Sequence, residues 1–392
     1  MGLPEDPQKF RAYVRNWLER NYASFLESWD GPRDARNLDL RRAWEDRLCA
    51  HGWSGLGWPR EFGGQALDLA RQAIFHEEHA LCGAPLGVNL VGHGILGPTL
   101  LHFGSAAQKQ RFLTGILNNQ VVWCQGYSEP ASGSDLASLR SRARNVGNGW
   151  VLNGHKIWTS FADRADWCFV LARSNPDVAP HKGLSFFLVD MRQPGVRVAP
   201  IRQLTGEHEF CEVFFEDVSI DADCLVGEPG DGWRIAMAAA SFERGTYFLP
   251  RLVRFRQELQ AVRKDIEAAG RHVATATAHG WKMRWARLAV DSHVLRLKAD
   301  QALAAARSGT PPGPEGSTTK LLWSEAHQRL LELSIEIRGD GLLRPRSGSG
   351  TDDFDLLQHT WLWTRAETIL AGTSEIQRNI VAERMLGLPK GA

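Results

Sequence analysis

The chain has 392 residues, of which 43% are hydrophobic and 23% are charged, a composition typical of a globular protein with two or three domains. Lys and Arg number 46 and Asp and Glu number 45, so the formal net charge is +1. This balance offers no basic footprint for a phosphate backbone and argues against nucleic acid as a partner. Because there is no apolar run of roughly eighteen residues, we also expect no membrane span.

The N-terminus and the cysteines predict a cytoplasmic protein. Pro4, Glu5, Asp6 and Pro7 stand where a secretory signal peptide needs a basic patch followed by an apolar stretch. The six cysteines are scattered and lack the close spacing of a disulfide framework. We therefore expect reduced cysteines and no metal site.

Apolar residues recur at helical spacing in the first part of the chain. Phe10, Val14 and Leu18 form one stripe, and Leu40 and Trp44 belong to a second. This pattern predicts an N-terminal α-helical domain over residues 1–122.

Two segments of this domain match a functional motif without its context. His76-Glu77-Glu78-His79 is one residue short of the i, i+4 spacing that directs two imidazoles at zinc, so we predict a solvated helix face. Gly92-His93-Gly94-Ile95-Leu96-Gly97 has the spacing of a dinucleotide-binding loop, but no βαβ pattern surrounds it. We predict a glycine-rich helix or turn there.

Residues 123–230 show the shorter period of strands and predict a middle β domain, built as a barrel or sandwich. Asn153-Gly154 lies between short apolar runs and predicts a hairpin turn. Further strands are expected at 168–171, 184–189, 196–201 and 213–218.

Helical spacing returns over residues 231–392. The expected helices, at about 233–268, 275–307, 316–337 and 361–386, predict a C-terminal four-helix bundle. The fold class is therefore α+β multidomain, with an α-helical domain, a β domain and a helical bundle in that order.

Three segments suggest ligand binding when taken together. Residues 123–135 form a loop of glycines and hydroxyl residues that can present donors to an acceptor-rich ligand. Residues 154–160 place Trp158 beside two hydroxyls, so that the indole can cover a flat ring while a hydroxyl bonds its edge. Residues 370–380 open the last helix, which Thr373 or Ser374 would cap. Taken singly, these segments also fit a surface turn, a hairpin and a helix cap.

In this order, the three segments resemble the acyl-CoA dehydrogenase family of flavoproteins. Residues 51–64 and 382–389 add to the resemblance, which covers nearly the whole chain. It implies an oxidoreductase of lipid metabolism that holds FAD and acts on an acyl-CoA or acyl-carrier-protein thioester. It assigns cofactor binding to Gln125, Gly126, Tyr127, Ser128, Ser134, Trp158, Thr159, Ser160, Thr373, Ser374 and Glu375, and substrate binding to Ser134, Ser241, Arg244 and Gly372.

The catalytic base departs from the commonest family pattern. Many members carry a Glu directly before the Gly-Thr of the last helix, where this chain has Ala371. Another family position, just before an Arg on an earlier helix, can carry the same Glu, and here Glu243 precedes Arg244. The resemblance implies that Glu243 removes the Cα proton and that the backbone N–H of Ala371 holds the enolate oxygen. As a single Glu in an amphipathic helix, Glu243 also fits a solvated position.

Two further departures concern the phosphates of a neighbouring subunit's FAD. The family's Arg-x-x-Phe-Gly run is absent, and its Gln-x-x-Gly-Gly-x-Gly stretch is reduced to Glu336-Ile337-Arg338-Gly339-Asp340-Gly341. An acidic residue beside a pyrophosphate is unfavourable unless Arg338 or Arg344 compensates. The assembly is therefore left open between a homotetramer or homodimer and a heteromer in which a partner completes the site.

Three functions follow from these observations. The first is FAD-dependent α,β-dehydrogenation of an acyl-CoA to the trans-2-enoyl-CoA, with electrons passed to an electron-transfer flavoprotein. The second is a flavin oxidase or monooxygenase, or an acyl-carrier-protein dehydrogenase of a biosynthetic pathway. The third is a non-catalytic or half-site subunit of a heteromeric dehydrogenase. Gly92, Gly94 and Gly97, in a segment that lines the acyl pocket in the family, fit either a wide pocket or close helix packing.

Overall fold

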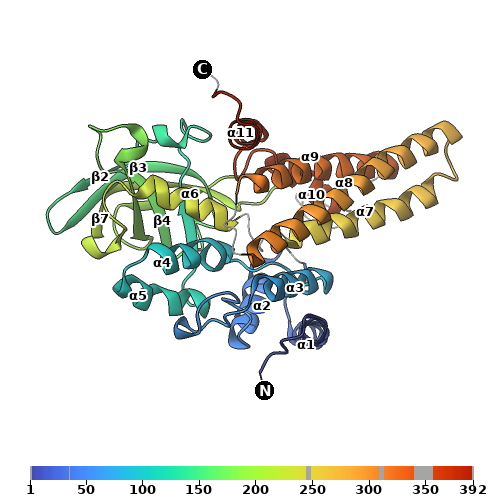
Figure 1. Ribbon diagram of the computed structural model, residues 1–392, viewed down its shortest axis with the longest axis horizontal. Coiled ribbons are helices and arrows are strands. Elements are labelled where there is room, and N and C mark those ends of the chain that lie inside the picture. Colours follow the sequence, from blue (N-terminus) through green and yellow to red (C-terminus); the bar gives the residue numbers. More distant parts are fainter. Residues whose placement is uncertain (1, 35, 244–248, 309–312, 340–355, 391–392) are drawn as a thin grey trace. The chain divides into compact units, whose positions relative to one another are not determined.

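The computed structural model describes residues 2–34, 36–243, 249–308, 313–339 and 356–390. The chain divides into two compact units (Figure 1). Met1–Gln203 and His208–Tyr247 form the first unit, and Leu204–Glu207 and Phe248–Ala392 form the second. The elements follow the order helices, strands, helices, which confirms the predicted fold class.

The described part of the first unit begins with five α-helices. Phe10, Val14 and Leu18 of the first helix pack with Leu40 and Trp44 of the second in one hydrophobic cluster, as the helical period predicts. The helices are α1 (Pro7–Ser28), α2 (Leu38–Ala50), α3 (Leu69–Leu81), α4 (Gly97–Phe103) and α5 (Ala106–Leu117).

The segment from His76 to His79 is not the solvated face that its charges suggest. The Glu78 carboxylate is buried on α3 and accepts hydrogen bonds from Arg11 (2.6 Å) and Arg15 (2.8 Å) of α1. Trp44 Nε1 donates to His79 Nε2 at 3.0 Å. Burial lowers the pKa of His79 to about 4, so the ring is neutral and accepts this bond. That prediction was wrong because the polar groups bond across the helices.

The glycine-rich segment is helical, as predicted. Gly92–Leu96 forms one turn of π-helix that leads into α4. A Cβ on Gly92 would lie 2.3 Å from Asn89 Oδ1, and a Cβ on Gly97 would lie 1.8 Å from the Trp58 ring. At these two positions the absent side chain serves close packing rather than a wide pocket.

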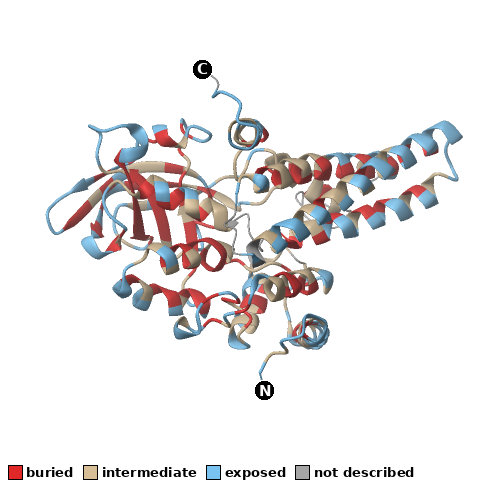
Figure 2. Cartoon of the chain, viewed as in Figure 1, coloured by how far each residue is buried: buried red, intermediate tan, exposed pale blue. Residues whose placement is uncertain are grey.

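Among the described residues of the first unit, eight strands form one sheet with the order β6-β7-β3-β2-β4-β5-β8, and β1 pairs with β4. The central strands β4 and β5 are almost wholly buried, because α6 (Gly232–Glu243) packs on β5 and shares one core with α4 and α5 (Figure 2). The predicted strands correspond to β4 to β7. The bounds are β1 (Trp123–Gly126), β2 (Arg142–Asn145), β3 (Gly149–Ser160), β4 (Trp167–Arg173), β5 (Leu184–Asp190), β6 (Val196–Pro200), β7 (Phe210–Asp221) and β8 (Leu225–Val226).

The predicted hairpin turn at Asn153-Gly154 is wrong, since β3 runs through these residues without turning. They instead face a bulge in β7, where Asn153 exchanges hydrogen bonds with Asp217 (2.9 and 3.0 Å). Gly154 allows a close approach, because a Cβ there would lie 2.1 Å from Ser141 Oγ. A polar side chain that bonds the backbone and a residue without a Cβ suit a bulge as well as a turn, so Asn-Gly here marks a bulge.

The second unit is helical. Helices α7, α8 and α9 run side by side, and α10 and α11 pack on α9 (Figure 1). The segment expected as one helix over 361–386 contains the end of α10, a 3-10 turn (Thr364–Ala366), the short helix α11 and a π-helical turn (Val381–Met385). The segment expected over 233–268 is also divided, since α6 ends at Glu243. The bounds are α7 (Leu249–Ala269), α8 (Thr275–Arg307), α9 (Glu315–Arg338), α10 (Leu356–Trp363) and α11 (Ser374–Ile380).

Helix α8 carries apolar residues on two faces. Trp281, Leu288 and Leu295 are buried in the core of the second unit. Met283, Val290 and Leu297 have the same seven-residue spacing but are 48%, 62% and 53% exposed. None of the helices within the described ranges is long and apolar enough to cross a membrane.

Candidate active site

A buried ion pair fixes the loop that follows β1. Lys156 of β3 is fully buried, and its Nζ donates to Glu129 Oε1 (2.8 Å) and to the carbonyl of Tyr127 (3.1 Å). Glu129 also accepts hydrogen bonds from the backbone N–H groups of Arg140 (2.6 Å) and Ser141 (2.8 Å). Residues 127–129 are therefore held against β3 at both their carbonyl and side-chain groups.

Burial and the partner's charge act in opposite directions on the pKa values of this pair. Burial lowers the pKa of Lys156, although the Glu129 carboxylate opposes the shift. Burial alone would raise the pKa of Glu129, but the Lys156 charge and the hydrogen bonds outweigh it and hold that pKa below its ordinary value. Each group thus favours the charged form of the other.

Next to Lys156, β3 projects an exposed indole. Ile157 and Trp158 together oppose Glu212 of β7, which makes a β-bulge. The bulge places Trp158 at φ +61°, a left-handed conformation that is rare for an aromatic residue. Its side chain is 57% exposed, although it lies in a strand of the sheet core. Strain of this kind typically marks a functional position.

The other predicted cofactor-binding residues of the middle domain differ in how far they are exposed. The N–H of Ile157 donates to the carbonyl of Ser128 (2.9 Å), so the loop after β1 lies directly beside the bulge. Ser160 is partly exposed, whereas Thr159 is fully buried and its Oγ1 has no hydrogen-bond partner within the described part of the chain. Of the remaining residues, Gln125 is partly exposed, Gly126 and Tyr127 are buried, and Ser134 is exposed.

In the second unit, the turn before α11 is held by two side chains. Ala371 and Gly372 both have positive φ, +53° and +90°. Lys320 Nζ donates to the carbonyl of Gly372 (2.8 Å), and Gln377 Nε2 donates to the carbonyl of Ala371 (2.9 Å). Because both carbonyls are fixed, the orientation of the peptide groups in this turn is fixed as well.

Thr373 caps α11, as the sequence predicts. Its side-chain oxygen accepts a hydrogen bond from the N–H of Ile376 (3.2 Å). Ser374 is buried, and Glu375 is exposed at the first turn of the helix. Hydrogen bonds from its own backbone N–H and from Thr373 lower the pKa of Glu375, so this carboxylate is charged at neutral pH.

The predicted base lies at the end of α6. Glu243 is the last residue of that helix, and both its side chain and the whole of Arg244 lie outside the described residues. Ser241 is partly buried, and its hydroxyl donates to the carbonyl of Ala238 (2.6 Å). The role of Glu243 therefore stays a prediction.

Glu336, the acidic departure from the family pattern, is neutralised within its own unit. Arg284 and Trp281 of α8 donate to its two oxygens, and these hydrogen bonds hold the pKa of Glu336 below its ordinary value. Arg338, one of the two arginines named as possible compensation, pairs with Asp265 (2.8 Å). Asp340 and Arg344 lie outside the described residues.

Sequence analysis missed the side chains that support the two ligand loops. Glu129, Lys156 and Gln377 lie within the predicted ligand segments and Lys320 lies outside them, but none of the four was predicted to hold a loop through its side chain. A signal was available for Lys156, because a charged residue on the inward phase of an apolar strand indicates a buried partner. For Lys320 the sequence offers no comparable signal.

Comparisons with known proteins cover nearly the whole chain. Family models of the acyl-CoA dehydrogenase N-terminal, middle and C-terminal domains match residues 4–120, 124–218 and 230–386. The chain is 45% identical to acyl-CoA dehydrogenase IpdE1 of Mycobacterium tuberculosis, covering 99% of both chains. It is 43% identical to IpdE1 of Mycolicibacterium smegmatis, covering 98% of both.

Solved structures agree with these relatives. The steroid ACAD Tcur3481-Tcur3483 superposes with a TM-score of 0.82 at 27% identity, covering 100% of both chains. The ChsE4-ChsE5 complex from Mycobacterium tuberculosis gives a TM-score of 0.80 at 26% identity, again over 100% of both chains.

The chain therefore belongs to the acyl-CoA dehydrogenase family. This confirms the predicted class of enzyme, an oxidoreductase that dehydrogenates acyl-CoA, and its cofactor, FAD. The described residues fit that cofactor. Trp158 offers an exposed flat face for a flavin ring, and the partly exposed Ser128 and Ser160 place polar groups next to it.

We expect that Glu129→Ala lowers the free energy of unfolding by about 3–5 kcal/mol, because it leaves the Lys156 charge buried without its carboxylate. Denaturant unfolding of the purified protein measures the change. Glu267→Ala is the matched control, since Glu267 forms an exposed ion pair with Arg263 and its loss costs about 1 kcal/mol or less. Equal effects of the two substitutions would contradict the assigned role of the Lys156–Glu129 pair.

Proposed function

We propose that the chain converts an acyl-CoA to the trans-2-enoyl-CoA and passes the electrons to an electron-transfer flavoprotein. Membership of the acyl-CoA dehydrogenase family supports the reaction class. The structural observation that carries the flavin site is Trp158, exposed at a strained bulge beside a rigid loop. A core tryptophan in an ordinary hairpin would be neither strained nor exposed.

Two groups of the chain would act on the thioester. A proton on Cα is weakly acidic, so its removal needs a carboxylate and a donor for the oxygen that gains charge. We assign the proton transfer to Glu243 and the donor to the backbone N–H of Ala371. Gln377 and Lys320 bond the carbonyls of Ala371 and Gly372 and so fix the two peptide groups that follow this N–H, which supports a preorganised conformation of the turn. When bound, FAD supplies the acceptor for the hydride that leaves Cβ.

The remaining predicted residues bind the two ligands. We propose that Trp158 covers one face of the flavin and that Ser160 and residues 125–128 bond its edge. Because the Thr159 side chain is fully buried, its contribution would come from its backbone. Cofactor binding is also proposed for Ser134, Thr373, Ser374 and Glu375, and acyl-CoA binding for Ser134, Ser241, Arg244 and Gly372.

For the acyl group we propose a bulky, ring-containing structure. The support is the solved neighbour named a steroid ACAD, which matches the whole chain at 27% identity. Gly92 and Gly97 do not support this proposal, because the space beside them is occupied by the side chains of Asn89 and Trp58.

The first experiment is the visible spectrum of the purified protein under anaerobic conditions with a panel of straight-chain and polycyclic acyl-CoAs. We expect a yellow protein that a polycyclic thioester bleaches. Glu243→Gln should lower the bleaching rate by at least about a thousandfold while flavin stays bound, because the proton acceptor is lost. Glu375→Gln removes the other carboxylate of the motif. Because Glu375 is proposed to bind the cofactor, its bleaching is compared at full flavin occupancy, where the rate should be normal.

Three results would contradict the proposal. If the flavin of Glu243→Gln is bleached at the normal rate, Glu243 is not the base. If bleaching is lost only in Glu375→Gln, the base is Glu375. A yellow protein that turns over with oxygen alone would favour a flavin oxidase or monooxygenase. A colourless protein that FAD does not reconstitute would favour a non-catalytic subunit.

Trp158→Gly should separate cofactor binding from stability. We expect the affinity for FAD to fall about tenfold, because the stacking face is lost. The apoprotein should melt at the same or a higher temperature, because glycine relieves the positive φ at this position. Fluorescence titration with FAD and thermal melting measure the two effects. Tyr13→Ala, which removes an exposed aromatic ring from α1, should leave FAD affinity unchanged.

We also propose that the chain assembles through α8. Support comes from the exposed stripe of Met283, Val290 and Leu297, whose seven-residue spacing suits a partner helix. A homotetramer or homodimer is the family expectation. The pairing of Glu336 with Arg284 and Trp281 favours the alternative heteromer. Glu336 stands at the position that faces a neighbour's FAD in the family pattern, and here its two oxygens accept hydrogen bonds from its own chain.

Native mass spectrometry with flavin quantification tests this assembly. Combined Val290→Glu and Leu297→Glu substitutions should reduce an oligomer to monomers, because charges would be buried at the contact. Leu81→Glu, at a similarly exposed leucine of α3, should leave the mass unchanged. A wild-type monomer that gains flavin only with a second family member would support the heteromer. An oligomer that resists the double substitution would exclude α8 as the contact.

A further inference from the structure

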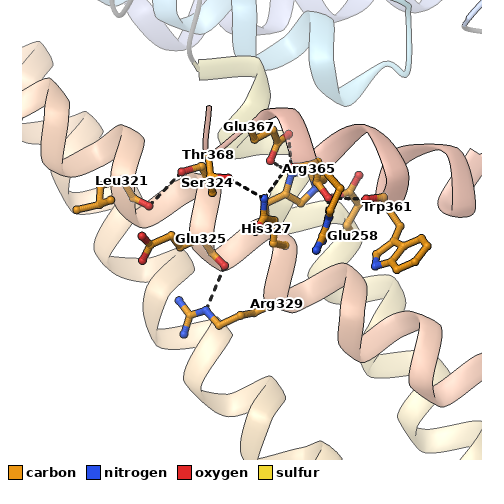
Figure 3. A network of polar contacts seen from close by, with 12 residues as sticks. Glu258, Leu321, Ser324, Glu325, His327, Arg329, Trp361, Arg365, Glu367 and Thr368 are labelled. Carbon is orange, nitrogen blue, oxygen red and sulfur yellow. Dashed lines mark hydrogen bonds and ion pairs between the residues drawn. The ribbon is translucent and has the colours of Figure 1, made fainter. Parts of the chain in front are cut away.

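A buried histidine of the second unit lies between two carboxylates. His327 Nε2 bonds Glu258 Oε2 of α7 at 2.7 Å, and His327 Nδ1 bonds Glu367 Oε2 at 2.8 Å (Figure 3). His327 and Glu367 are 4% and 2% exposed. Three segments that are distant in the sequence are therefore joined through one imidazole ring.

Burial raises the pKa of Glu367, while the charge of His327 opposes this shift. With both carboxylates ionised, the arrangement requires a protonated ring. A neutral imidazole has a single N–H and can donate to only one carboxylate, whereas the imidazolium donates to both. Burial opposes the charge, but the hydrogen bonds and charges of Glu258 and Glu367 raise the pKa of His327 to about 9. The charge of Arg251 on α7 also lowers the pKa of Glu367. The aromatic rings of Phe255 and Trp323 pack against the His327 ring.

Glu367 leads directly into the turn that carries Ala371. It lies four residues before Ala371, and the N–H of Leu370 donates to the carbonyl of Ala366 (2.8 Å). Helix α9 holds this segment at three levels. Gln328 Nε2 donates to the carbonyl of Thr364 (2.7 Å), His327 bonds Glu367, and Lys320 bonds the carbonyl of Gly372.

We propose that His327, as an imidazolium bonded to Glu258 and Glu367, is a positioning residue that sets the backbone of the Ala371–Thr373 turn. It touches neither cofactor nor substrate and acts through Glu367. The catalytic consequence rests on the proposed function, in which the N–H of Ala371 holds the thioester oxygen. Loss of one ring proton would leave one of the two carboxylates without its donor. Where this carboxylate is Glu367, the segment that leads into the turn would lose its bond to His327 of α9.

The sign of the pH dependence follows from the raised pKa. The stabilisation is complete below the ordinary histidine pKa of about 6.5 and is lost as the pH rises through about 9. Rising pH should therefore loosen residues 366–374 while the rest of the second unit stays ordered.

Hydrogen exchange of the FAD-loaded protein, read by mass spectrometry and corrected for intrinsic rates, tests this inference. His327→Gln should speed exchange of peptides within 366–374 about tenfold at pH 7 and remove its dependence on pH between 7 and 10. Peptides from α8 should be unchanged. His359→Gln is the matched control, because buried His359 bonds one carboxylate, Glu207, at 2.7 Å in the same unit.

The second readout is the rate at which the flavin is reduced by whichever acyl-CoA of the panel bleaches the wild-type protein. His327→Gln should lower this rate about a hundredfold with FAD content unchanged, because a displaced donor is costly to the transition state. If no acyl-CoA reduces the wild-type flavin, the proposed function fails, and the exchange data still decide whether His327 positions the turn.

Glu258→Gln covers the case in which His327→Gln does not fold. It removes the less buried carboxylate and should move the loosening of residues 366–374 to lower pH, since the imidazolium loses one partner. Unchanged exchange in both variants, or faster exchange throughout the second unit, would overturn the positioning role.

Discussion

A buried lysine bonded to a loop carbonyl is the constraint on which the candidate ligand loop of each unit depends. Lys156 bonds the carbonyl of Tyr127 in the first unit, and Lys320 bonds that of Gly372 in the second. Burying an ammonium group is costly without partners, so each lysine holds its loop in place as a condition of folding. Glu129 completes the first arrangement by accepting the charge of Lys156. The ligand loops are thus as rigid as the helix and sheet that carry the lysines.

This rigidity allows the chain to hold strained backbone where ligands are expected. Trp158 and Ala371 both occupy the left-handed region, and each such position costs about 1–3 kcal/mol. The strain persists because neighbouring hydrogen bonds determine the conformation, those of the 127–129 loop beside Trp158 and those of Lys320 and Gln377 around Ala371. Position 371 also bears on the missing glutamate, because the backbone N–H proposed as the donor is present whatever the side chain.

The sequence predicted the order of the elements well, because helical and strand periods report burial on one face. Phe10, Val14 and Leu18, and the strands β4 to β7, follow from that period alone. It failed where local patterns have two structural meanings. Asn153-Gly154 faces a bulge instead of forming a turn, and Glu78 and His79 bond across helices instead of facing solvent. The ligand loops were found by resemblance, whereas Lys320 and His327 were missed, because their partners lie 52 and 40 or more positions away.

The departures from the family pattern form a consistent arrangement of contacts. At position 336 a glutamine would carry no charge for Arg284, so Glu336 has a function inside its own unit as the partner of Arg284 and Trp281. Those two residues belong to α8, whose opposite face exposes Met283, Val290 and Leu297. One face of α8 is therefore fixed by an ion pair and a buried core, while the other is left apolar and unpaired within the described chain. A helix fixed on one side and apolar on the other is suited to receive a second chain without rearranging its own unit.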